Sequence, residues 1–281
     1  MRGGRANPPV LKRFGQHFLT DQTALQAIAD AVASRDWETI IEVGPGRGAL
    51  TDILASRGNP LIAIEIDRAL AVGLGERYAS NPRVTIVERD VLDVDLASMA
   101  NGPFVVVGNV PYYITTPILF HVLRPPYPRH AVFLVQIEVA ERMISPPGSK
   151  TYGALSANVQ AIANAEILRD VPPGAFRPPP KVYSSVVRVV PRTDPLLERN
   201  EVDAFRKFVQ SLFGMRRKQL GNSLRSASQL SAEEAHAVLE ESGIDPMLRA
   251  ESLSPSQLVS LMRSSQKNRT STAIREDGEE R

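Results

Sequence analysis

The clearest structural signal in this chain is the stretch Thr39-Ile-Ile-Glu-Val-Gly-Pro-Gly-Arg-Gly48. Its first five residues are mostly apolar and β-branched, which is typical of a strand buried inside a parallel sheet. Gly44 and Gly46 follow, and the composition from Ala49 to Arg57 predicts a helix. A strand, a glycine turn and a helix open many nucleoside-binding units, because glycine lets the backbone turn tightly and approach a ligand. Unrelated turns often mimic this glycine pattern, so its meaning depends on the neighbouring strands.

Three further segments have the composition of buried parallel strands, namely residues 61–66, 84–87 and 104–108. Each runs into a polar residue at its end, and these residues are Glu65, Asp90 and Asn109. Open α/β sheets bind their ligands at the carboxyl ends of the strands. Glu65 lies about 20 residues beyond the first glycine, the usual place of a carboxylate that accepts both ribose hydroxyls. Each acid alone fits a solvated loop, but the set together predicts a nucleoside site.

The tetrapeptide Asn109-Val-Pro-Tyr112 suits a planar base whose exocyclic amine reacts. The Asn109 side-chain oxygen and a nearby backbone carbonyl can accept the two N–H bonds of such an amine. Pro111 lacks an N–H and stiffens the turn, and Tyr112 offers a ring on which the base can stack. The competing interpretation is an ordinary strand-to-helix turn with an asparagine cap.

The same residues favour S-adenosylmethionine over other nucleoside cofactors. A phosphate-binding loop would need Gly-Lys followed by Ser or Thr after the first strand, and that sequence is missing. Binding of NAD is possible, but no residue pattern indicates an acid or base for hydride transfer. S-adenosylmethionine has no phosphate and needs an acid at its ribose, a polar group at its adenine and backbone contacts to its methionine part. The sequence supplies these groups.

The composition sets further limits. The 281 residues suffice for one large domain and a small one, and the absence of cysteine excludes disulfides and fits a reducing, cytoplasmic compartment. The four histidines form no metal-ligand pattern, so no metal is expected. No apolar run approaches the length of about 18 residues that a membrane helix needs. The net charge is only +2, so nucleic-acid binding would require local basic patches.

The remainder of the chain divides into two expected domains with unstructured ends. Leu25, Ile28, Ala29 and Val32 have helical spacing and predict a helix with one apolar face. Strands are predicted at 132–135 and 182–190, helices at 139–144 and 154–163, and a stiff proline-rich loop at 171–181. The polar, proline-punctuated segment 191–201 is the expected domain boundary. Helical spacing of apolar residues and two capping boxes, starting at Ser231 and Ser254, predict a helical domain over 199–263. Residues 1–10 and 264–281 are expected to be disordered because they are polar and lack periodicity.

With these pieces assembled, the chain from about residue 11 to 262 resembles the small-subunit ribosomal RNA adenine dimethyltransferases, the KsgA/RsmA family. The motifs that carry the resemblance are Lys12-Arg-Phe-Gly-Gln-His-Phe-Leu19, Glu42-Val-Gly-Pro-Gly46, Glu65-Ile-Asp67, Asn109-Val-Pro-Tyr-Tyr-Ile114, Phe176-Arg-Pro-Pro-Pro-Lys-Val182, Arg216-Arg-Lys-Gln-Leu-Gly-Asn-Ser-Leu224 and Gly243-Ile-Asp-Pro-Met-Leu-Arg-Ala-Glu251. Two positions depart from the usual pattern. His17 stands where asparagine is common, and Tyr183 stands where aspartate often follows the Pro-Pro-Pro-Lys-Val run.

The resemblance implies an α/β fold, with a Rossmann-like seven-stranded methyltransferase domain over 11–191 and the helical domain as an RNA-binding domain. It implies a monomer that makes two adjacent adenosines N6,N6-dimethyl, in the hairpin near the 3′ end of 16S rRNA in the small ribosomal subunit or its precursor. The positions implied to hold S-adenosylmethionine are His17, Leu19, Gly44, Gly46, Glu65, Asp90 and Asn109.

In the expected reaction the adenine leaves its stack, Asn109 binds its amine, and Tyr112 and Phe176 sandwich the ring. The expected phosphate contacts are Lys12, Arg13, Lys181, Arg216, Arg217 and Lys218. Two alternatives remain at this point. One is a large-subunit dimethylase of the antibiotic-resistance type. The other is a non-catalytic ribosome-assembly factor, in which the Asn-Val-Pro-Tyr or glycine motif would have decayed, whereas both are intact here. A DNA adenine methylase is disfavoured, because it would usually carry aspartate at the first position of the tetrapeptide.

Overall fold

The protein contains a mixed seven-stranded sheet in a computed structural model that describes residues 17–215 and 218–279. The strand order is β4-β3-β2-β5-β6-β9-β7. Strands β2 to β6 run parallel to their neighbours, and β9 is antiparallel to β6. The bounds are β2 Thr39–Val43, β3 Leu61–Glu65, β4 Val84–Glu88, β5 Phe104–Asn109, β6 Ala131–Gln136, β7 Ala163–Val171 and β9 Ser184–Pro191. The predicted Rossmann-like fold is confirmed.

Strand β7 is the one strand of this sheet that the residue pattern did not indicate. Its sequence, Ala-Asn-Ala-Glu-Ile-Leu-Arg-Asp-Val, contains few β-branched residues, and most of its side chains are at least partly exposed. It lies at the edge of the sheet, beside β9. An edge strand packs against one neighbour only, so it can form without the apolar run that marks a central strand.

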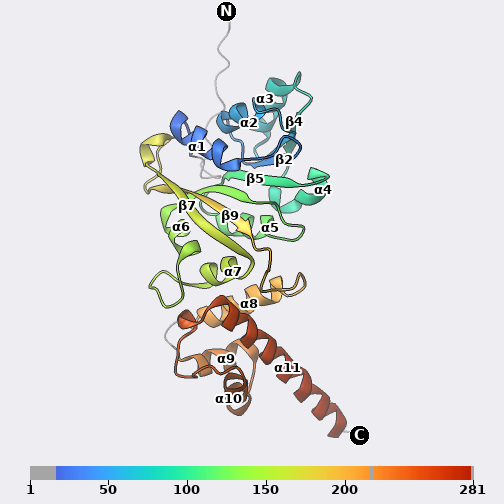
Figure 1. Ribbon diagram of the computed structural model, residues 1–281, viewed down its shortest axis with the longest axis vertical. Coiled ribbons are helices and arrows are strands. Elements are labelled where there is room, and N and C mark those ends of the chain that lie inside the picture. The colour runs from blue at the N-terminus through green and yellow to red at the C-terminus, as the bar shows by residue number, and fades with distance from the viewer. Residues whose placement is uncertain (1–16, 216–217, 280–281) are drawn as a thin grey trace, which may run out of the picture. The chain divides into compact units, whose positions relative to one another are not determined.

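The chain divides into two compact groups of residues, which we describe separately (Figure 1). The sheet unit consists of the described residues up to Ala140 together with Ala165–Pro191, and the helical unit consists of Glu141–Asn164 and the described residues from Arg192 on. The sequence predicts residues 141–164 to be part of the methyltransferase domain. These residues group with the C-terminal helices because the Tyr152 hydroxyl donates to the Leu253 carbonyl at 2.9 Å and the Gly148 N–H donates to the Glu251 carbonyl at 2.7 Å.

Helices of the sheet unit begin at aspartate caps in three cases. The Asp21, Asp67 and Asp95 side chains each accept a hydrogen bond from a backbone N–H in the first turn of the following helix. Such caps satisfy donors that the helix itself leaves unpaired. The helices are α1 Gln22–Val32, α2 Ala49–Ala55, α3 Arg68–Tyr78, α4 Leu96–Ala100, α5 Thr115–Val122 and α6 Ile137–Ile144, of which α6 crosses into the helical unit, with short 3-10 turns η2 Val91–Asp93 and η3 Pro173–Ala175.

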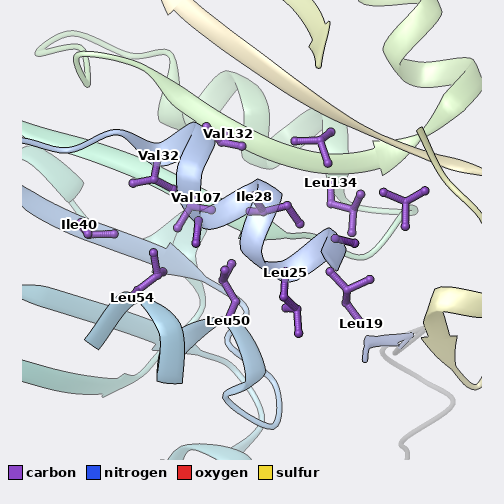
Figure 2. Close-up of a cluster of buried hydrophobic side chains, with 14 of the residues drawn as sticks. Leu19, Leu25, Ile28, Val32, Ile40, Leu50, Leu54, Val107, Val132 and Leu134 are labelled. Atoms are coloured by element: carbon purple, nitrogen blue, oxygen red, sulfur yellow. The ribbon is translucent and has the colours of Figure 1, made fainter. Parts of the chain in front are cut away.

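One face of the sheet packs against α1 and α2 (Figure 2). The α1 side chains Leu25, Ile28 and Val32 lie at helical spacing in this cluster, as the sequence predicted. Val107 of β5 and Leu134 of β6 are among the sheet residues that meet them, and all five are almost fully buried. Burying one such side chain contributes about 1.5–3 kcal/mol. The cluster therefore fixes α1 against the sheet. It also fixes the short segment that precedes α1, because Leu19 of that segment belongs to the cluster.

That preceding segment forms a small second sheet with part of the proline-rich loop. Strand β1, Phe18–Leu19, pairs antiparallel with β8, Phe176–Arg177. The backbone N–H of Thr20 also donates to the Ala175 carbonyl at 2.8 Å. The structure therefore brings together two motifs that lie more than 150 residues apart in the sequence.

The helical unit contains α7 Ala154–Ile162, α8 Val202–Phe213, α9 Leu220–Ser228, α10 Ala232–Glu241, the 3-10 turn η4 Ala250–Ser252 and α11 Pro255–Glu279. Both predicted capping boxes are present, at Ser231 with Glu234 and at Ser254 with Gln257. The sequence predicted a disordered tail from residue 264, but α11 continues to Glu279. The long polar segment follows a well-capped apolar start, and a helix once nucleated extends at little cost. Within the described residues, no helix has both the length and the apolar character to span a membrane.

Candidate active site

A cavity of about 380 Å³ opens at the carboxyl ends of β2, β3 and β5 in the sheet unit. The turns that follow these strands form its walls, together with β1 and the start of α1. Most of the predicted cofactor and catalytic residues line this one cavity: His17, Leu19, Gly44, Gly46, Glu65, Asp90, Asn109, Pro111 and Tyr112. The parallel strands place their ends at the same edge of the sheet, which is why residues so far apart in the sequence converge.

The glycine turn after β2 approaches the cavity with bare backbone. Gly44 and Gly46 have φ angles of +68° and +59°, a region that residues with a Cβ atom rarely adopt. A Cβ atom on Gly46 would lie only 3.0 Å from Cε1 of Phe18. The Phe18 ring in turn carries the Arg47 guanidinium, 4.5 Å from its centroid. The turn is thus held under β1, and a side chain at Gly46 would displace the ring.

Glu65 connects the end of β3 to the glycine turn. Its Oε2 accepts the Gly46 N–H at 2.9 Å, and its Oε1 accepts the Asp67 N–H at 2.9 Å. The side chain is 4% exposed, and burial raises the pKa of its carboxyl despite these two hydrogen bonds. A carboxylate at this strand end is suited to accept ribose hydroxyls, as the sequence predicted.

We expect Glu65→Ala to weaken S-adenosylmethionine binding by about tenfold to a hundredfold, corresponding to about 1.5–3 kcal/mol for a lost hydrogen bond to a charged acceptor. The effect is limited to about one net bond because Glu65 already accepts two backbone N–H groups. Calorimetric titration of both proteins measures it. Asp93→Ala, at an acid of the sheet unit outside the cavity walls, serves as the control. Equal cofactor affinity of parent and Glu65→Ala would contradict the assigned role.

Asn109 and His17 are joined at the cavity wall. The Asn109 Nδ2 donates to the His17 carbonyl at 3.1 Å, and the His17 Nδ1 lies 2.8 Å from the Pro178 carbonyl. The amide nitrogen is therefore used by the protein, while the amide oxygen points to the other side of the planar group and is the natural acceptor for a ligand N–H. Because the bond from Asn109 uses the backbone carbonyl of His17, it does not depend on which side chain residue 17 carries.

Tyr112 is fixed at both of its ends. Its hydroxyl lies 2.7 Å from Oγ of Ser184, and its ring stacks on His17 with 5.9 Å between centroids and 24° between planes. Burial raises the pKa of the Tyr112 hydroxyl, so it stays protonated near neutral pH. A ring held in this way offers a flat face at the cavity wall at little cost in conformational entropy.

Phe176 lies in the hydrophobic core and not at the cavity wall. Its ring was expected opposite Tyr112, but the side chain is 0% exposed and belongs to the hydrophobic cluster around α1. It is not among the residues that line the cavity. The pairing of β8 with β1 sets Phe176 beside Leu19, whose side chain is also buried, so the ring packs inward. The neighbouring Arg177 lines the cavity instead.

The predicted phosphate contacts fall outside the cavity or outside the described residues. Lys181 is exposed in the loop that follows β8, and Lys218 is exposed in the helical unit. Lys12, Arg13, Arg216 and Arg217 lie outside the described residues. Further residues line the cavity without having been predicted for it, among them Phe18, Glu42, Arg47, Arg89 and Arg177. Phe18 and Arg177 stood within quoted motifs, but only the β1–β8 pairing brings them to the site.

The residues present fit S-adenosylmethionine. The glycine turn leaves no room for a Cβ beneath Phe18, and the walls carry the acids Glu42, Glu65 and Asp90. Carboxylates at these strand ends suit the ribose hydroxyls and the positive charge of such a cofactor. Oε2 of Glu42 is buried and accepts no hydrogen bond from the part of the chain that the structure describes.

The fold and this cavity define the class of protein: a Rossmann-like methyltransferase that depends on S-adenosylmethionine. A model of the ribosomal RNA adenine dimethylase family matches residues 10–267. The chain belongs to this family.

Curated relatives agree with this assignment over most of their length. Ribosomal RNA small subunit methyltransferase A of Acidobacterium capsulatum is 44% identical over 256 residues, which cover 89% of each chain. The protein of the same name from Xanthomonas euvesicatoria pv. vesicatoria is 43% identical over 260 residues, which cover 90% of this chain and 95% of that one.

Two solved structures are also similar. The 23S rRNA methyltransferase ErmE is 27% identical, with a TM-score of 0.67 over 89% of this chain and 99% of that one. A dimethyladenosine transferase from Plasmodium falciparum has a TM-score of 0.76 over 90% of this chain and 98% of that one, at 23% identity, and shares the fold.

Proposed function

We propose that this protein transfers methyl groups from S-adenosylmethionine to N6 of two adjacent adenosines near the 3′ end of 16S rRNA, making each dimethylated. The observation that carries the proposal is that Asn109 and Tyr112 line the same cavity as the glycine turn and Glu65. An amide acceptor and a fixed aromatic face at this place suit a flipped adenine. The identity to small-subunit methyltransferases over about nine-tenths of the chain supports the choice of RNA.

The proposed roles follow from the contacts of the chain's own residues. The oxygen of Asn109 binds an N–H of the adenine amine and turns its lone pair out of conjugation with the ring. Tyr112 stacks on the base, and its face stabilises the positive charge that develops on N6 by about 0.5–2 kcal/mol. S-adenosylmethionine supplies an electrophilic methyl group on sulfur when bound. Formation of the N6–carbon bond makes the amine strongly acidic, so its proton passes to water and no general base is required.

The substrate proposed is the RNA within a small ribosomal subunit or its precursor, which the protein meets as a monomer in the cytoplasm. Exposed Lys181 in the sheet unit and Lys218 in the helical unit would contact phosphates, together with the basic residues of the motifs at 12–13 and 216–217. Double-stranded and structured RNA is recognised largely by shape, which suits a chain with two units.

Incubation of purified small subunits with the protein and isotopically labelled S-adenosylmethionine tests this function. Mass spectrometry of the extracted RNA should find two dimethylated adenosines in the 3′ hairpin. Large subunits under the same conditions, and the Asn109→Ala variant on small subunits, are the controls. Label on the large-subunit RNA alone would favour the antibiotic-resistance type of dimethylase, and a lack of label on either would favour a non-catalytic assembly factor.

Neutralising Arg216, Arg217 and Lys218 together should weaken RNA binding and reduce its salt dependence. Each lost phosphate contact lowers the log–log slope against salt by about 0.7–0.9. Turnover at saturating RNA should remain, because Lys218 lies in the helical unit and does not line the cavity. Binding titrations at several salt concentrations measure the slope, with Lys207→Gln, at an exposed cation of α8, as the control. Identical slopes for parent and triple variant would show that the cluster is ordinary surface.

A further inference from the structure

Glu42 is a buried acid in the wall of the cofactor cavity that the proposed reaction does not use. It lies within β2, where it pairs in register with Ala63 of β3 and Val107 of β5. Its side chain is 2% exposed, and Oε2 accepts no hydrogen bond from the described residues. An ionised carboxylate in such surroundings is strongly unfavourable unless a cation pairs with it. The protein must therefore keep this group neutral or supply a positive charge.

The groups that face Glu42 give it no positive partner among the described residues. Burial is the main cause that raises its pKa, and the negative charges of Glu65 and Asp52 raise it further. The Thr51 hydroxyl acts in the opposite direction, and together these causes raise the pKa to about 8. The residues beside it in β3 and β5 are apolar. Of the arginines that line the cavity, Arg47 has its guanidinium over Phe18, and Arg177 donates to the Gly174 and Phe176 carbonyls. Arg89 is exposed in the turn after β4 and is not among the charged groups that shift the pKa of Glu42.

We propose that Glu42 senses the charge of the cofactor: it is protonated in the empty cavity and loses its proton when the sulfonium ion binds, so that the cavity holds the methyl donor more tightly than the demethylated product. The inference rests on the proposed cofactor chemistry. S-adenosylmethionine carries one more positive charge than S-adenosylhomocysteine, because transfer of the methyl group turns the sulfonium into a neutral thioether. A nearby carboxylate distinguishes these two forms, and a neutral carboxyl group does not. Methyl transfer would then return Glu42 to its protonated form and favour product release.

The sign of the pH dependence follows from linkage. With its pKa near 8, Glu42 is mostly protonated at neutral pH in the empty cavity. Binding of a cation lowers this pKa, so S-adenosylmethionine affinity should rise by up to about tenfold per pH unit as pH increases towards 8 and then level off. The affinity for the uncharged thioether should gain no such increase. The ratio of the two affinities therefore rises with pH in the parent protein.

The experiment is calorimetric titration of the parent and Glu42→Gln with each of the two ligands between pH 6 and 9. Glutamine has the shape of a protonated glutamate, so the variant fixes the neutral form. Performing the titrations in two buffers of different ionisation enthalpy gives the number of protons released. Both ligands also carry an ionisable amino group, and the comparison with Glu42→Gln removes its contribution.

We expect the parent to release close to one additional proton with S-adenosylmethionine at pH 7, and its preference for this ligand over the thioether to increase about tenfold per pH unit below pH 8. Glu42→Gln should show a constant preference. Equal proton release and equal preference in both proteins would overturn the inference while leaving the methyltransferase function intact. If S-adenosylmethionine failed to bind the parent at all, both proposals would fall.

Thermal unfolding without any ligand provides a second measurement of the same group. A raised pKa means that the folded protein holds this proton more tightly than the unfolded chain, so the parent should lose stability as pH rises from the ordinary glutamate value of 4.5 towards 8. The melting temperature of Glu42→Gln should fall less over this range. Should the variant fail to fold, proton release by the parent with the two ligands still decides the question, since equal release would refute the sensor.

Discussion

Asn109→Ala is expected to slow methyl transfer by about 10²–10³ while cofactor affinity changes little, because one preorganised polar contact to the reacting amine is lost. The amide nitrogen of Asn109 is used in the bond to the His17 carbonyl, which fixes the amide plane and directs its oxygen away from that carbonyl. The side chain therefore meets the substrate as an acceptor of fixed direction. Single-turnover rates with small subunits and calorimetry with S-adenosylmethionine measure the two effects separately.

A second substitution separates the two bonds that Asn109 makes. Asn109→Asp keeps acceptor oxygens but loses the N–H that donates to the His17 carbonyl. If the acceptor role dominates, Asn109→Asp should be faster than Asn109→Ala. If the residue serves only to hold His17, both variants should be equally slow, and the assigned role would be wrong. Asn81→Ala, at a surface loop of the same unit, should react like the parent.

The central strands were predictable from the sequence because their signal is local. β2, β3 and β5 are buried strands of a parallel sheet and appear as short apolar runs with polar residues at their ends. The face of α1 was equally clear, since apolar residues at helical spacing indicate one buried side. Strand β7 escaped notice because an edge strand with exposed side chains carries no such pattern. The length of α11 escaped notice because its polar C-terminal part resembles an unstructured tail.

The site was predictable to the extent that it depends on strand ends. Glu65, Asp90 and Asn109 line one cavity, as expected for residues at the carboxyl ends of β3, β4 and β5 in one parallel part of the sheet. The pairing of β1 with β8 depends on contacts between segments distant in sequence, and no local pattern encodes it. This pairing puts Phe18 over the glycine turn, Arg177 at the cavity and Phe176 in the core. The stacking role expected for Phe176 did not take this register into account, and the register determines which way its side chain points.

Phe176→Ala is accordingly expected to destabilise the sheet unit by about 3–5 kcal/mol, the usual range for removing a buried phenylalanine ring. The ring is 0% exposed and packs in the cluster that anchors α1, where Leu19, Leu25 and Ile28 also lie. Removing it leaves a cavity between β8 and α1. Urea-induced unfolding of parent and variant measures the loss.

Phe176→Leu distinguishes packing from base stacking. Leucine retains much of the apolar volume, so the loss of stability should be near the cost of a volume-conserving exchange, about 1.5 kcal/mol. Because the ring does not line the cavity, the methyl-transfer rate of the folded variant should stay within a fewfold of the parent. Tyr112→Leu, at the aromatic residue that does line the cavity, should instead lower the rate strongly with little change in cofactor affinity. A rate for Phe176→Leu as low as that of Tyr112→Leu, at nearly parental stability, would mean that the ring turns outward to meet the base during the reaction.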